Sequence, residues 1–141
     1  MLFTFLLAPV LGELLSSSMP IPEFLIGWLP MAVLYGSGAL LVREMAIRWG
    51  SGWVGIVLLG MAYGIYEEAI VVRSFFDPGW QDLDALATYG RAGGVNWLWS
   101  ELLTFFHAAV PIASTILIAH VVHPGARHRP WLQRRGIIWS G

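Results

Sequence analysis

The sequence contains no cysteine and no lysine, and only 12% of its 141 residues are charged. A soluble globular domain is roughly 25% charged, so this chain carries about half the expected charge. The missing cysteines exclude disulfides, thiolate metal sites and cysteine nucleophiles. The net charge of −1 provides no basic field that would attract nucleic acid. These absences exclude a soluble domain, a disordered tail and a nucleic-acid-binding protein.

Apolar sequence dominates instead, since 57% of the residues are hydrophobic and the mean hydropathy is +0.66. A helix needs about 20 apolar residues to cross a hydrocarbon core of roughly 30 Å. The segments that suit such helices are about 1–18, 24–42, 53–76 and 97–121. We therefore predict an all-α fold, a polytopic transmembrane helix bundle of about four spans, forming a single domain over residues 1–141.

All eight basic residues are arginine, and their positions predict the orientation. Arg43 and Arg48 flank the connection between the second and third spans, and four more lie in the tail 122–141. Short loops rich in Lys and Arg stay in the cytoplasm, so both regions are predicted to be cytoplasmic. Four spans then place both termini inside and the loop 77–96 outside. We expect a multi-pass protein of the bacterial inner membrane, in contact with the lipid bilayer.

The end of the chain allows two interpretations. Ile137-Ile138-Trp139 starts a new apolar run directly after a basic stretch. It is either the beginning of another span of a longer protein or an interfacial tail, and both stay open here. Four short spans also make a thin core, so we expect a homo-oligomer or a larger membrane complex.

Several ionisable residues lie within the apolar spans, where each costs about 2.5 to 3.5 kcal/mol to insert. They are Glu13, Glu67, Glu68, Arg73, Glu101 and His107. At 1.5 Å per residue, Glu67 and Glu68 lie roughly 12–14 Å below the outer end of the third span. His107 lies roughly 15 Å below the outer end of the fourth. We therefore predict a buried polar network in the outer half of the bundle.

Pairing is the expected way to neutralise these charges. We predict an ion pair between Arg73 and Glu101. We also predict contact of His107 with Glu67 or Glu68. Such a group suits a proton relay, an acid–base pair or a metal site. The other interpretation is a polar network that only fixes helix register.

Local motifs refine this prediction. Gly60 and Gly64 form a GxxxG motif on the face of the third span that carries Glu67, which lets a neighbouring helix approach closely. In the fourth span, Pro111 frees a backbone carbonyl one turn earlier, near His107.

Metal binding is not expected from the histidines near the end of the fourth span. His120 and His123 have an i, i+3 spacing that zinc ligands can use. Because they lie at a membrane end beside a basic tail, we interpret them as interfacial. We predict neither a metal ion nor another cofactor for the chain.

The chain resembles two groups of membrane proteins, and neither resemblance rests on a catalytic motif. Over most of its length the chain resembles uncharacterised prokaryotic multi-pass membrane proteins, through strings such as Tyr63-Gly64-Ile65-Tyr66-Glu67-Glu68 and Phe106-His107-Ala108. That resemblance implies a location but no activity. By its size and by Glu13 in the first span, the chain is also similar to small multidrug-resistance transporters, which are four-helix proton-coupled dimers.

Glu67-Glu68, followed by Arg73 and then by His107 in the next span, resembles the CPBP intramembrane endopeptidases. These membrane enzymes carry a Glu-Glu-x-x-x-Arg motif and later histidine motifs that activate a water. The resemblance implies that Glu67 or Glu68 would be the catalytic base and His107 its partner. Here four residues separate Glu68 from Arg73, and Leu103 stands where the family has phenylalanine. We therefore favour a transport or accessory subunit, with an intramembrane hydrolase using Glu67, Glu68 and His107 as the alternative.

Overall fold

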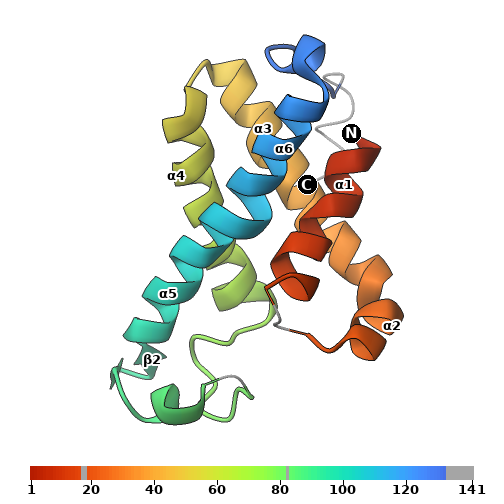
Figure 1. The fold of residues 1–141 in the computed structure, drawn as a ribbon. Helices are drawn as coiled ribbons and strands as arrows, with labels where there is room; N and C mark the ends of the chain where they lie inside the picture. The colour runs from red at the N-terminus through yellow and green to blue at the C-terminus, as the bar shows by residue number, and fades with distance from the viewer. Residues whose placement is uncertain (17–18, 82, 133–141) are drawn as a thin grey trace.

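The computed structural model describes residues 1–16, 19–81 and 83–132, and almost all of its regular structure is helical (Figure 1). The predicted all-α membrane bundle is confirmed, because three helices in the described residues are long and apolar enough to cross a membrane: Ile21–Trp49, Gly52–Val71 and Trp97–Val122. They correspond to the second, third and fourth predicted spans. The second is longer at both ends than predicted, and the third ends at Val71 rather than at residue 76.

Each long helix contains a π-helical segment. The first consists of α2 (Ile21–Met31), η2 (Ala32–Gly36) and α3 (Ser37–Trp49). The second consists of α4 (Gly52–Ile65) and η3 (Tyr66–Val71). The third consists of α5 (Trp97–His107), η5 (Ala108–Ser114) and α6 (Thr115–Val122). In η2, η3 and η5 the backbone hydrogen bonds join residues five positions apart rather than four. This geometry is rare and often found at functional sites.

The first helix is shorter than the predicted span 1–18. It consists of α1 (Leu2–Pro9) and the π-helical η1 (Val10–Leu14), whose 8 and 5 residues rise about 20 Å together. That is less than the roughly 30 Å of a hydrocarbon core. The helix ends where Ser16 Oγ turns back to donate to the Gly12 carbonyl oxygen, at 2.5 Å. Residues 17–18 lie outside the described residues.

The two ends of the bundle carry different segments of the chain (Figure 1). Met1, the connection between α3 and α4, and the end of α6 lie at one end, and the Phe3 and His123 rings meet there with centroids 5.8 Å apart. The segment between η3 and α5 covers the opposite end. The number of membrane passes and the end that faces the cytoplasm remain predictions.

The main core lies between α1, η2, α3, α4, η5 and α6, and apart from Tyr35 it is built from alanine and β-branched residues. Its buried members are Ala8, Tyr35, Ala39, Val42, Ala46, Ile56, Ile112 and Ile116. Small side chains let helix backbones approach closely, as is usual in membrane bundles. The outer surface is also apolar: Ile26 is 86% exposed and Val54 is 71% exposed. Such a surface suits lipid rather than water.

The segment covering the other end contains a short 3-10 helix, η4 (Asp84–Ala87), and a hairpin of β1 (Arg91–Ala92) and β2 (Val95–Asn96). Beneath it, Phe75, Leu83 and Trp99 form a second buried cluster. This segment includes the predicted outer loop 77–96, which therefore packs onto the bundle as a cap rather than lying free of it.

Candidate functional site

A polar centre lies between the helices in the half of the bundle nearest the 77–96 loop. Its ionisable members are Glu13 on η1, Glu67 and Glu68 on η3, and His107 at the end of α5. Tyr35 on η2 joins them. Every one of these residues lies on a π-helical segment or directly before one, so the irregular turns of all four helices meet at this centre.

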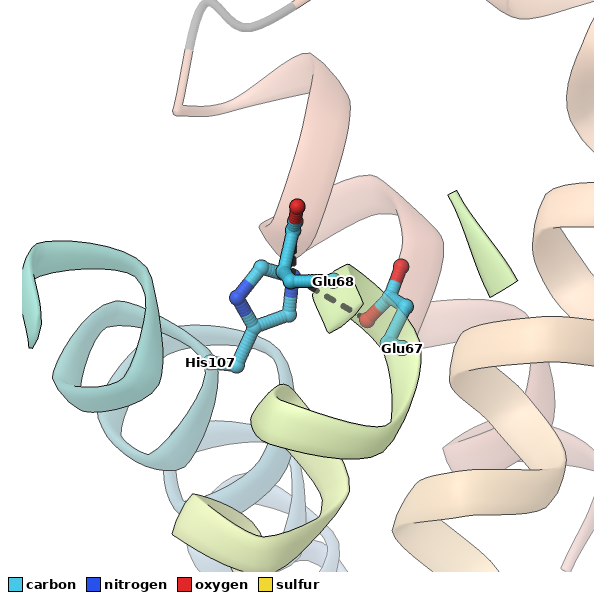
Figure 2. A group of neighbouring side chains, drawn as sticks. All are labelled: Glu67, Glu68 and His107. Atoms are coloured by element: carbon cyan, nitrogen blue, oxygen red, sulfur yellow. Dashed lines mark ion pairs between the residues drawn. The ribbon is translucent and has the colours of Figure 1, made fainter. Parts of the chain in front are cut away.

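His107 contacts both carboxylates from one ring nitrogen (Figure 2). Its Nε2 is 3.0 Å from Glu67 Oε2 and 3.4 Å from Glu68 Oε1. His107 and Glu67 are each 2% exposed, and Glu68 is 7% exposed. Figure 2 shows the two glutamates reaching His107 from a single turn of η3. The predicted contact between the histidine and the glutamate pair is therefore present in the structure.

The other ring nitrogen determines what this contact requires. His107 Nδ1 is 2.8 Å from the carbonyl oxygen of Leu103, which can only accept a hydrogen bond. Nδ1 is therefore assigned the hydrogen, and Nε2 of a neutral ring would present a lone pair to two carboxylates. Acceptors facing acceptors repel each other. A positive charge, either a proton or a metal ion, is needed between Nε2 and the carboxylates.

Hydrogen bonds from neighbouring side chains hold the glutamates in place. Ser74 Oγ donates to Glu68 Oε2, and Trp99 Nε1 donates to Ser74 Oγ at 3.2 Å. On the other side of the centre, Tyr35 donates to Glu13 Oε1 at 2.5 Å, and its hydroxyl lies 3.5 Å from His107 Nε2. The centre is thus a connected network rather than a single ion pair.

A cavity of about 380 Å³ adjoins the network. Its polar lining comes from Glu13, Glu67, Glu68, Tyr35 and His107, and Trp80 and Gln81 of the loop cover it. The cavity gives the buried carboxylates room for water or a small ligand on the loop side. On the opposite side, the small-residue core closes the bundle.

Gly60 and Gly64 allow η5 and α5 to approach α4. A methyl group placed on Gly64 would lie 2.8 Å from His107 Cβ, and one on Gly60 would lie 3.0 Å from Ala108 Cα. Both distances are too short for ordinary contact, so the motif brings the helix of His107 against the helix of the glutamates.

The predicted pair of Arg73 and Glu101 does not form. Both side chains are exposed, and no ion pair between them occurs in the described part of the chain. The reason is that the helix ends at Val71. Arg73 therefore lies beyond it, with a φ of 64° in the left-handed region, and its side chain is exposed. Ser74 takes the buried position instead, where it binds Glu68.

Three polar members of the network were not predicted from the sequence: Tyr35, Ser74 and Trp99. A signal for the irregular turns was nevertheless present. Pro9 and Pro30 lie inside helices just before η1 and η2, and Pro111 lies inside η5. A proline in an apolar helix removes one backbone hydrogen bond and displaces the preceding turn.

A second polar cluster, which we call the tail clasp, lies at the other end of the bundle. It consists of Arg43, Glu44 and Arg48 on α3, together with the tail segment 126–132. Arg43 is fully buried, and its Nη2 donates to the carbonyl oxygens of Ala126 at 2.8 Å and Arg129 at 3.1 Å. Its guanidinium also stacks on the Trp131 ring, 3.4 Å from the centroid.

Glu44 completes the tail clasp. One carboxylate oxygen pairs with Arg48 at 2.7 Å, and the other accepts from the backbone N–H of Trp131 at 2.9 Å. His120 Nε2 accepts from Arg43 Nε at 3.1 Å, whereas His123 is exposed beside Phe3. Within the described ranges, these two histidines do not converge as metal ligands would. The tail clasp fixes the first residues after α6 onto α3.

The fold and the buried centre define a class of protein: a multi-pass membrane protein with a polar site inside its bundle. Residues 2–140 match the model of a family described as an uncharacterized membrane protein family, and the chain belongs to that family. Comparison with curated proteins and with solved structures gave no match. The resemblance to uncharacterised membrane proteins is thus confirmed, and the resemblance to the CPBP endopeptidases has no support.

Proposed function

We propose that this membrane protein is a transport or accessory subunit that binds a cation between His107 and the pair Glu67 and Glu68. The observation that carries the proposal is the position of His107 Nε2, 3.0 Å and 3.4 Å from two buried carboxylates while Nδ1 is tied to a carbonyl. Buried charges in a membrane mark ion pathways when they face a cavity inside the bundle. Here the cavity of about 380 Å³ supplies that access.

The residues that line the cavity all belong to the half of the bundle nearest the 77–96 loop. Ala8, Val42 and Ile112 belong to the core that lies between the cavity and the far end of the bundle. Passage of a cation through the whole membrane therefore requires a rearrangement or further helices. Only 28–39% of each candidate span is buried within the chain, which leaves apolar surface for a second copy or a larger complex. We propose such an assembly in the bacterial inner membrane.

Flux into proteoliposomes tests the proposal. Vesicles containing the protein and either a pH-sensitive or a zinc-sensitive dye should show proton or Zn²⁺ entry above that of empty vesicles. Glu67→Gln and His107→Gln should each abolish it, because each removes one side of the cation site. Glu23→Gln is the matched control, since Glu23 is exposed at the start of α2. Entry no faster than in empty vesicles, or unaffected by Glu67→Gln, contradicts the proposal.

An intramembrane hydrolase is the second candidate. It is favoured by the direct contact of Glu67, Glu68 and His107 beside a cavity, because a hydrolase needs its acid and base within hydrogen-bond reach of one water. A quenched fluorescent transmembrane peptide in the same vesicles separates the two functions. Cleavage lost in Glu68→Gln would support the hydrolase, and intact peptide together with Glu67-dependent flux would support transport.

A further inference from the structure

We infer that the cation held by Glu67, Glu68 and His107 is a divalent transition metal of the zinc class. This inference rests on the proposed function, since it names the ion that the same site takes. It departs from the sequence-based prediction that the chain binds no metal.

The spacing of the three side chains suits one metal ion. Their potential ligand atoms all lie within 4.8 Å of one another. His107 Nε2 is 3.0 Å from Glu67 Oε2 and 3.4 Å from Glu68 Oε1. A tetrahedral zinc ion with bonds of about 2.0–2.1 Å separates neighbouring ligand atoms by about 3.3 Å. The observed separations from Nε2 therefore match those in a tetrahedral site, and the two carboxylates would move closer together around a bound ion.

One divalent ion balances the charge of both glutamates, which would otherwise need two protons. No arginine in the described part of the chain forms an ion pair with Glu67 or Glu68. Two carboxylates in hydrocarbon would keep an unbalanced charge if His107 alone were protonated. A divalent ion neutralises both. In addition, Glu67 Oε2 is buried without a hydrogen-bond partner among the described residues, although it points at His107.

The surrounding hydrogen bonds orient the ligands in the way that metal sites require. A ligating histidine usually donates its other ring N–H to a backbone carbonyl, as His107 Nδ1 does to Leu103. Ligating carboxylates are themselves hydrogen-bonded, as Glu68 is by Ser74. An imidazole among the ligands selects zinc-like metals, because Mg²⁺ and Ca²⁺ prefer oxygen alone. Three protein ligands leave one position for water from the adjoining cavity.

Calorimetric titration of the full chain in detergent with Zn²⁺ tests the inference. We expect one Zn²⁺ per chain, and a loss of affinity of more than about 100-fold in Glu67→Gln and His107→Gln. Ser74→Ala should lose about 10- to 100-fold, the usual cost of removing an outer partner of a ligand. His123→Gln should be unchanged, because His123 is exposed and remote from the centre. Equal losses in His123→Gln and His107→Gln would overturn the inference by assigning the binding to surface histidines.

Co²⁺ loading of the unmodified protein keeps the test valid if a ligand variant fails to fold. Intense visible absorption is expected for tetrahedral cobalt, and a weak octahedral spectrum would overturn the inference. Absence of Zn²⁺ binding together with Glu67-dependent proton flux would overturn the metal site but leave transport intact. Zn²⁺ binding through His107 without any flux would leave the metal site intact and contradict transport.

Discussion

At the scale of single residues, the site depends on the two nitrogens of His107. Nδ1 is fixed by the Leu103 carbonyl, so Nε2 is the nitrogen that faces Glu67 and Glu68. An ionised glutamate at this depth is costly unless a proton or another cation balances its charge. Gly64 makes the contact possible, because any side chain there would collide with the histidine.

Gly64→Ala should therefore destabilise the protein. The new methyl group would lie 2.8 Å from His107 Cβ, and overpacking of this kind costs about 1–3 kcal/mol. Thermal unfolding in detergent should show a lower midpoint. Gly27→Ala is the control, since nothing lies within 4 Å of the added methyl, and alanine's better helix propensity should leave stability equal or higher. Equal midpoints for both variants would show that α4 and α5 can move apart freely.

At the scale of elements, the positions where helices end decide whether Arg73, Ser74 and Arg43 reach the two polar clusters. The end of η3 at Val71 excludes Arg73 from the centre and brings Ser74 to Glu68. At the other end, α3 extends to Trp49, beyond the predicted end at 42, which places Arg43 on a helix facing the tail. The tail clasp is the result.

Arg43→Met should release the tail while keeping most of the side-chain volume. The substitution removes charged donors to the carbonyl oxygens of Ala126 and Arg129. Each such bond contributes about 1.5–3 kcal/mol, and a loss of only 1.4 kcal/mol makes local opening about tenfold more frequent. Trypsin should then cut after Arg127 at least about tenfold faster.

Arg73→Gln is the matched control, since Arg73 is exposed at the opposite end of the bundle. It should leave the cleavage rate after Arg127 unchanged. A rate that is also unchanged in Arg43→Met would mean that the tail is held by other contacts.

The sequence predicts the elements better than it predicts their contacts. Apolar length is a local property, so the three long spans and the common depth of Glu67, Glu68 and His107 can be derived by counting residues. The end of the helix at Val71 depends on how the following segment packs against the bundle. No local sequence pattern encodes that packing. The tail clasp joins residues more than 80 positions apart, so it too is beyond such counting.

At the scale of the whole molecule, the chain is a thin bundle with different polar clusters at its two ends. The cavity is lined in part by the 77–96 loop, and the tail clasp lies at the end that carries Met1 and α6. The arginines of the tail clasp and the tail predict that this second end faces the cytoplasm.

Single cysteines can test this orientation, because the sequence has no cysteine of its own. Thr88→Cys lies in the exposed loop, and His128→Cys lies in the exposed part of the tail. In intact bacterial cells, a membrane-impermeant maleimide should label Thr88→Cys at once and His128→Cys only after the membrane is opened. The reverse pattern would invert the topology and place the cavity on the cytoplasmic side.

The most direct measurement of the central claim is the nitrogen-15 NMR spectrum of His107 in the folded protein, with His107→Gln used to assign its signals. The account predicts a hydrogen on Nδ1 and, with one equivalent of Zn²⁺ added, a metal-bound Nε2. A neutral ring that carries its hydrogen on Nε2 and does not respond to Zn²⁺ would contradict the claim that a cation lies between His107 and the two glutamates.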